Sequence, residues 1–135
     1  MSLTGGCLCG AVRYEITAEA REVFFCYCGQ CRKAQGTPFV ASVPVALTDF
    51  RLVQGVDSLK AFRATPSKAR YFCSHCGSPI YSQVDGNGTV RIRAGTLDTP
   101  PSLQLSAHIY TANKASWYAI NDQAPQYPAR EPNRG

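Results

Sequence analysis

The sequence predicts an all-β protein built from several short antiparallel strands. Three observations support this prediction. The chain has 135 residues, which is the size of one domain. It contains 11 Gly and 9 Pro, and so many turn-forming residues suit short strands better than long helices. Its apolar residues alternate with polar ones in brief runs. Hydrophobic residues make up 44% of the chain, enough to fill a core, which argues against disorder.

Alternation of apolar and polar residues places the strands in order along the chain. Val12, Tyr14 and Ile16 alternate with polar residues and predict the first strand. Residues 32–35 predict a helical turn that Gly36 ends. Residues 85–88 predict a turn, residues 100–101 end a strand, and residues 114–120 fit no single element. The remaining strands are expected at residues 23–26, 39–43, 50–53, 59–63, 69–72, 80–84, 90–94 and 108–110. We expect one domain over residues 1–124 and a loosely ordered, proline-rich tail over 125–135.

Seven cysteines are the most informative feature of the sequence. They form a Cys-x-Cys pair, a Cys-x-Cys-x-x-Cys triplet and a Cys-x-x-Cys pair, at Cys7 and Cys9, at Cys26, Cys28 and Cys31, and at Cys73 and Cys76. An odd number cannot pair fully in one chain, and disulfides within such short loops are often strained. Redox Cys-x-x-Cys chemistry usually accompanies a βαβ unit, which is not predicted here. Thiolates at these spacings favour a metal site, and zinc is the expected ion.

The number of cysteines suggests how they are shared between ions. A structural zinc takes four ligands, whereas a reactive zinc keeps one position open. The two pairs would give a structural site that joins the start of the chain to its middle. The triplet would supply three local ligands to a second ion. Spacing alone leaves open a different division, such as one four-cysteine site with three spare buried thiols.

The net charge and the lengths of the apolar stretches limit the expected partners and location. The formal net charge is +5, but seven thiolates and two Zn²⁺ would bring it to about +2, so a nucleic-acid partner is not expected. Arg91 and Arg93 flank Ile92 and are expected on one solvated face of a sheet. No apolar stretch is long enough to span a membrane, and residues 1–6 do not resemble a signal peptide. These features predict a cytoplasmic protein, and the oligomeric state stays open.

The cysteines and their surroundings resemble a known family nearly from end to end. The matching segments are residues 6–10, 26–33, 70–78 and 95–98, together with Gly36, Phe39, 108–110 and Trp117. They are similar to the glutathione-dependent formaldehyde-activating enzymes, a family that includes centromere protein V and has the Mss4-like fold. The resemblance implies a structural zinc at the outer cysteine pairs and a second zinc with an exposed position at the triplet. It also implies a carbon–sulfur lyase, an S-(hydroxymethyl)glutathione synthase-like enzyme. The family often has His where this chain has Tyr27.

Zinc held by three thiolates is a weak Lewis acid, and a thiol suits its open position. We therefore expect Cys26, Cys28 and Cys31 to be the catalytic site, with glutathione sulfur adding to formaldehyde or a related small electrophile. Because glutathione is anionic, Arg32 and Lys33 are the first candidates to bind it.

Other residues have weaker expected roles. Lys114 is a third candidate for glutathione binding, and Tyr27 and Phe39 are expected to line the pocket. His75 is expected to be exposed, His108 to be a hydrogen-bonded structural residue, and Trp117 to lie in the core. Two alternatives to an enzyme remain. One is a zinc-binding interaction module without catalysis, and the other is a thiol or redox sensor.

Overall fold

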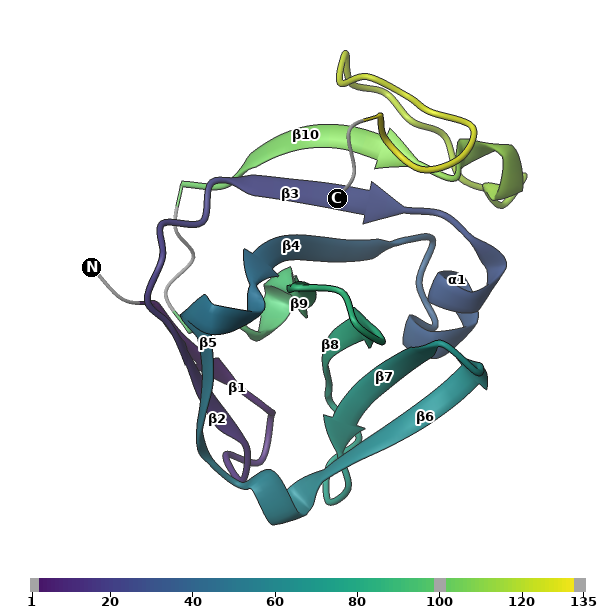
Figure 1. Cartoon of the computed structure of the whole chain (residues 1–135). Helices are drawn as coiled ribbons and strands as arrows, with labels where there is room; N and C mark the ends of the chain where they lie inside the picture. Colours follow the sequence, from purple (N-terminus) through teal and green to yellow (C-terminus); the bar gives the residue numbers. More distant parts are fainter. Residues whose placement is uncertain (1–2, 99–101, 133–135) are drawn as a thin grey trace.

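The computed structural model describes residues 3–98 and 102–132. Within these ranges it contains ten strands, one short α-helix and four 3-10 turns (Figure 1). The predicted all-β class is therefore confirmed. None of the helical segments in the described part of the chain combines the length and apolar character that a membrane span requires.

The larger sheet has seven strands in the order β10-β3-β4-β9-β8-β7-β6. β10 runs parallel to β3, and every other neighbouring pair in this sheet is antiparallel. The sheet curls so that β10 and β6 lie at opposite sides of the molecule (Figure 1). Its strands are β3 (Glu22–Cys26), β4 (Val40–Ala46), β6 (Leu59–Thr65), β7 (Lys68–Cys73), β8 (Pro79–Val84), β9 (Thr89–Arg93) and β10 (Gln104–Ile109).

The smaller sheet packs against the same core as the larger one. It consists of β1 (Leu3–Gly6), β2 (Arg13–Ile16) and β5 (Phe50–Gln54), in the order β1-β2-β5. Tyr14 and Ile16 of β2 are buried together with Val43, Ile80 and Ile92 of the larger sheet. The alternation along β2 and β9 turns one face of each strand towards this shared core, and burial of that face stabilises the fold.

The helix α1 (Gly29–Gln35) lies beyond the end of β3 (Figure 1). It begins three residues before the predicted helical turn because Cys28 caps it. The Cys28 Sγ accepts a hydrogen bond from the Cys31 backbone N–H at 3.3 Å. Gly36 ends the helix as predicted, in a left-handed conformation with φ of 69°.

Each predicted strand agrees with an observed one in position, with small differences at the ends, but β1 was not predicted, so the strand predicted as the first is β2. β10 begins four residues earlier than expected. Residues 114–120 form no helix or strand, and the predicted strand end at residues 100–101 lies outside the described residues.

The prediction that Trp117 lies in the core is wrong. Its side chain is 72% exposed. The next residue, Tyr118, points inward instead and packs against Tyr27 and Phe39, with ring centroids 6.0 and 5.8 Å apart. Because adjacent residues of a turn point in different directions, the inward position of Tyr118 leaves Trp117 facing solvent.

Residues 125–132 of the predicted tail are more ordered than their proline content suggests. Residues 125–132 lie along β10 instead of extending loosely, as Figure 1 shows in yellow above that strand. The Tyr127 N–H donates to the His108 carbonyl, and the Tyr110 N–H donates to the Ala129 carbonyl. The tail thus satisfies backbone groups at the edge of β10 that would otherwise stay unpaired, which is why it docks there.

Candidate metal centres and the adjoining pocket

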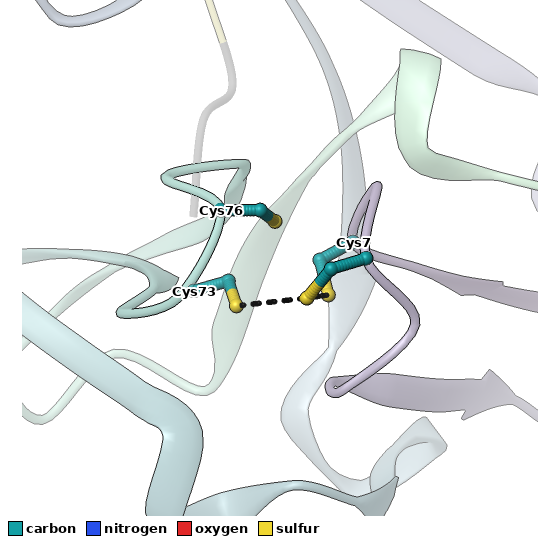
Figure 2. Close-up of side chains that lie close together, drawn as sticks. Cys7, Cys73 and Cys76 are labelled. Atoms are coloured by element: carbon teal, nitrogen blue, oxygen red, sulfur yellow. Dashed lines mark hydrogen bonds between the residues drawn. The ribbon is translucent and has the colours of Figure 1, made fainter.

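Four cysteines converge between two loops that are far apart in the sequence. Cys7 and Cys9 follow β1, Cys73 ends β7, and Cys76 lies in the turn before β8. Cys7, Cys73 and Cys76 point toward a common centre (Figure 2). All four sulfur atoms lie within 4.8 Å of one another, so the four cysteines form a group that can hold one metal ion. We call this group the four-cysteine site.

The two loops of the four-cysteine site share one local design. In each, the second cysteine is followed by a glycine with positive φ, Gly10 at 83° and Gly77 at 79°. The Gly10 and Gly77 N–H groups donate back to the carbonyls of Cys7 and Cys73. Other backbone N–H groups point at sulfur, including Val12 N–H to Cys7 Sγ at 3.2 Å. Such N–H donors favour the thiolate, the form that binds metal.

The sulfur spacing in the four-cysteine site fits tetrahedral zinc. Zn–S bonds of about 2.3 Å in a tetrahedron place the sulfur atoms about 3.8 Å apart. The Cys7 and Cys9 sulfurs are 3.6 Å apart, and the Cys9 and Cys73 sulfurs are 3.8 Å apart. All seven cysteines are free thiols, and an S–S bond would require about 2 Å.

The triplet Cys26, Cys28 and Cys31 forms a second sulfur group that can hold a metal ion. Cys26 ends β3, Cys28 caps α1 and Cys31 lies in the first turn of that helix. Their sulfur atoms also lie within 4.8 Å of one another, and Cys26 and Cys31 are 3.3 Å apart. Cys26 and Cys31 are buried, whereas Cys28 is partly exposed. The seven cysteines are therefore grouped as four and three.

The triplet borders a pocket of about 360 Å³, which we call the triplet pocket. All three cysteines line it, so its contents could reach their sulfur atoms. Helix α1 and residues near the end of β10 form one part of its wall. Side chains of β4, β7, β8 and β9 form the rest, and they are Val40, Ser42, Lys68, Arg70, Ser82, Arg91 and Arg93.

Strand register brings these cations to one face of the larger sheet. Arg70 of β7 pairs with Ser82 of β8, and Ser82 pairs with Arg91 of β9. Arg93 lies two residues beyond Arg91 and pairs with Ser42 of β4. Because side chains alternate along a strand, paired residues share one face. Arg70, Arg91 and Arg93 therefore form a row beside the triplet, which we call the arginine row.

The prediction that Arg91 and Arg93 lie on a solvated sheet face is wrong. Arg93 is buried and Arg91 is largely buried. Val90 and Ile92 face the core on one side of β9, so Arg91 and Arg93 face the other side, as expected. On that other side both arginines line the pocket beside the triplet, and Glu131 of the tail pairs with Arg91.

The surroundings of the triplet favour the thiolate of Cys31, whereas hydrogen bonds with Cys28 and Cys31 raise the pKa of Cys26. Hydrogen bonds with Cys26 and Cys28 lower the pKa of the Cys31 thiol, and the positive charges of Arg70 and Lys68 lower it further. The Arg70 Nη2 lies 3.8 Å from the Cys31 sulfur. Burial lowers the pKa of Arg93 to about 10, so this guanidinium is still charged at neutral pH.

The residues predicted to bind substrate lie outside the lining of the triplet pocket. Arg32 and Lys33 are on α1, with Lys33 exposed. The Lys114 ammonium donates to the Ala115 carbonyl and that of Tyr118. Phe39 stacks on Phe25 with ring centroids 4.1 Å apart. The sequence analysis did not predict that Lys68 and Arg70 line this pocket. The one local signal was the position of Arg70, three residues before Cys73.

Tyr27 lies between two triplet cysteines, but its ring points away from the pocket into a buried aromatic group. Its hydroxyl hydrogen-bonds to His108 Nδ1 at 2.7 Å, and His108 Nε2 bonds to Asp122 at 2.8 Å. His108 is therefore a hydrogen-bonded structural residue, as predicted. His75 is exposed, also as predicted.

The grouping of the cysteines agrees with comparisons to known proteins. The model of the family described as glutathione-dependent formaldehyde-activating enzyme matches residues 2–113. The chain belongs to this family. All seven cysteines, α1 and the arginine row lie within the matched range, so the triplet pocket is part of the family's domain.

Individual members of the family are only distantly similar to this chain. A protein of Halomonas elongata, provisionally named a glutathione-dependent formaldehyde-activating enzyme, is 29% identical over 91% of this chain and 83% of its own length. An uncharacterized lyase of Schizosaccharomyces pombe is 22% identical over 94% of this chain and 91% of its own length. A crystal structure of a Rhodobacter sphaeroides protein has a TM-score of 0.57 and 26% identity, covering 70% of this chain and 87% of that one.

Proposed function

We propose that this protein is a zinc-dependent carbon–sulfur lyase that joins glutathione to formaldehyde or a related small electrophile. The observation that carries the proposal is the unequal sharing of sulfur. Four cysteines face one another between two loops, whereas three line a pocket large enough for a small substrate. Four ligands complete a structural zinc, while three leave a position for a substrate.

The seven cysteines suit zinc in number, spacing and chemistry. Cys7, Cys9, Cys73 and Cys76 would hold the structural ion, and Cys26, Cys28 and Cys31 the ion beside the pocket. When bound by the triplet, Zn²⁺ would supply a soft cation with one free position that takes a thiol sulfur and favours its thiolate. The chain provides the surroundings of that sulfur. Arg70 and Lys68 place positive charge beside it and so stabilise a thiolate arriving in the pocket.

The proposed reaction is an addition of a thiol to a carbonyl. The sulfur of glutathione forms a bond to the carbonyl carbon, the C=O π bond breaks, and the thiol proton ends on the oxygen. The product is an S-hydroxymethyl adduct, and the reverse reaction breaks the carbon–sulfur bond, which makes the enzyme a lyase. The names of the Halomonas elongata and Schizosaccharomyces pombe relatives support this reaction class.

Free thiols also suggest where the protein works. Seven unpaired cysteines suit a reducing compartment, where glutathione is abundant and disulfides are rare. The proposed location is the cytoplasm, and the proposed partner is a small thiol and not a nucleic acid or membrane.

Calorimetric titration with glutathione tests the proposal. The zinc-loaded protein is expected to bind glutathione and to bind S-methylglutathione at least about tenfold more weakly, because the methyl group removes the thiol. Cys28→Ser is expected to abolish both the binding and any acceleration of adduct formation. Absence of heat at millimolar glutathione, or unchanged turnover in Cys28→Ser, would rule out an enzyme acting through the triplet.

A redox sensor is the second candidate, and the partial exposure of Cys28 favours it. Accessible thiolates are readily oxidised, and oxidation would release a bound ion. Zinc release by peroxide, reversed by a reductant and without any thiol-transfer turnover, would support the sensor over the enzyme. A single, tightly held zinc per chain would instead support a non-catalytic module.

A further inference from the structure

The triplet pocket carries more positive charge than a neutral aldehyde requires. Lys68, Arg70, Arg91 and Arg93 all line it, and its described lining includes no aspartate or glutamate. Three thiolates with one Zn²⁺ would leave a single net negative charge. The cations therefore exceed what the metal site needs, and the excess points to an anionic group on the substrate.

Two of these arginines also have buried donors that the protein does not use. Arg70 is only 9% exposed, and its Nη1 finds no acceptor among the described residues. The Nη1 of Arg91 is likewise buried without an acceptor there. Buried donors without a partner are costly, and they are typical of sites that receive a ligand.

The chain itself shows what kind of group the arginine row accepts. A carboxylate oxygen of Glu131, in the docked tail, lies 3.0 Å from the Arg91 Nη2. Glu131 is buried and sits in an adjoining depression that shares Lys68, Ser82 and Arg91 with the triplet pocket. One end of the row is thus paired with a carboxylate, and the fork of Arg70 is suited to bind another.

The position of Arg70 indicates which part of a substrate carries this carboxylate. Its guanidinium contacts Cys31 Sγ at 3.8 Å, so an anion that it binds lies directly beside the triplet. In an adduct of a thiol with a 2-oxo acid, the carboxylate is attached to the very carbon that bonds sulfur. The carboxylates of glutathione lie several bonds further from its sulfur.

We propose that the preferred electrophile is a small 2-oxo acid of the glyoxylate type, with its carboxylate bound by Arg70 and its carbonyl facing the triplet. This inference rests on the proposed function, since it names the substrate class of that site. The thiol sulfur bonds to the carbonyl carbon, the C=O π bond breaks and the thiol proton moves to the oxygen. No oxidant or reductant is needed.

A two-by-two comparison separates the two possible sources of the carboxylate. The thiol is either glutathione or 2-mercaptoethanol, which has neither a carboxylate nor an amine, and the aldehyde is either glyoxylate or formaldehyde. Exchange NMR measures adduct formation above the uncatalysed rate with wild-type protein and three variants. Arg70→Gln removes the charge, Arg70→Lys keeps it, and Arg63→Gln is a matched control on β6, where Arg63 pairs with the exposed Asp85. Thermal unfolding confirms that each variant is folded.

The expected result is a preference for glyoxylate over formaldehyde with both thiols. Arg70→Gln should reduce the acceleration with glyoxylate by about tenfold or more, because hydrogen bonds to charged groups are worth this much. The acceleration with formaldehyde should fall by a smaller factor, because only the positive charge beside the thiolate is lost there. Arg70→Lys should restore part of both losses, and Arg63→Gln should match wild type. An equal loss with both aldehydes would assign Arg70 to the thiolate alone and overturn the 2-oxo acid proposal.

A binding measurement supports the assignment independently of turnover. In a spectrum of ¹⁵N-labelled arginine side chains, acetate is expected to shift the Arg70 signal, and neutral acetamide is expected to leave it in place. If neither reagent shifts it, the carboxylate site is overturned.

Other outcomes overturn different parts of the account. If Arg70→Gln affects glutathione but not 2-mercaptoethanol with either aldehyde, Arg70 binds the thiol, and the 2-oxo acid proposal is wrong while the lyase stands. Acceleration with formaldehyde but none with glyoxylate also overturns the 2-oxo acid proposal and leaves the lyase in place. No acceleration with any pair overturns the proposed function itself.

Discussion

Replacing Cys73 by serine tests the role of the four-cysteine site in stability. An ion at this site would link residues that are 64 positions apart, Cys9 and Cys73, whose sulfurs lie 3.8 Å apart. A covalent link closing a loop of this length stabilises a protein by about 4 kcal/mol through the entropy of the unfolded chain. A metal link acts in the same direction, because an ion that binds only the folded site adds its binding free energy to folding.

The loss of this link should be visible in urea unfolding. Cys73→Ser is expected to bind one zinc fewer and to lose about 4 kcal/mol of unfolding free energy. Cys28→Ser serves as the control, because the triplet closes only a short local loop; its outermost members, Cys26 and Cys31, are five positions apart. Loop-closure entropy alone makes the control milder by about 2 kcal/mol. Equal destabilisation by both variants, or a change below about 1 kcal/mol in Cys73→Ser with its zinc lost, would refute this reasoning.

Three further predictions concern the surface and the tail. Trp117→Ala should change the unfolding free energy by less than about 0.5 kcal/mol, and iodide should quench the fluorescence of Trp117 in the folded protein, since the side chain is exposed; a large loss of stability would contradict its exposure. Glu131→Gln removes the ion-pair partner of the largely buried Arg91 and should cost about 1–3 kcal/mol in urea unfolding, whereas an unchanged midpoint would show that the tail does not dock. The hydrogen bond and charge of Arg13 lower the pKa of Asp98. Asp98 therefore contributes stability that is present above its unfolded pKa of about 4 and is lost as the pH falls through its folded pKa. Asp98→Asn should flatten the dependence of unfolding free energy on pH below about pH 4, and a curve parallel to that of wild type would contradict this.

The metal sites could be predicted from the sequence because their information is local. Cys26, Cys28 and Cys31 are close enough in the chain that a strand end and one helical turn bring their sulfurs together. The two outer pairs each form a short glycine-containing loop of the same kind. Joining the two outer pairs in one site required only one further step, which was to divide seven cysteines into four ligands for a closed zinc site and three for an open one.

The arginine row could not be predicted because it depends on long-range strand register. Alternation correctly places Arg91 and Arg93 on the face of β9 opposite Ile92, but alternation alone does not say what covers that face. Only the order β4-β9-β8-β7 brings Arg70 beside Ser82 and Arg91. The face then becomes the wall of a pocket, although its residues resemble a solvated surface in the sequence.

Residue type misled the prediction at Trp117 and in the tail for a related reason. A large aromatic residue usually lies in a core, yet the turn that contains Trp117 directs Tyr118 inward instead. Prolines usually indicate loose structure, yet residues 125–132 find unpaired backbone groups on β10. In both cases the exposure or order of the residues depends on a neighbouring part of the fold, which a local sequence pattern does not contain.

Zinc-edge anomalous diffraction from crystals soaked with glutathione would test the central claim most directly. The account predicts two ions per chain. One is bound by Cys7, Cys9, Cys73 and Cys76, and the other by the triplet together with the sulfur of glutathione at about 2.3 Å. A single ion, or a triplet ion whose fourth ligand is a protein side chain, would contradict the claim that this site is left open for a thiol.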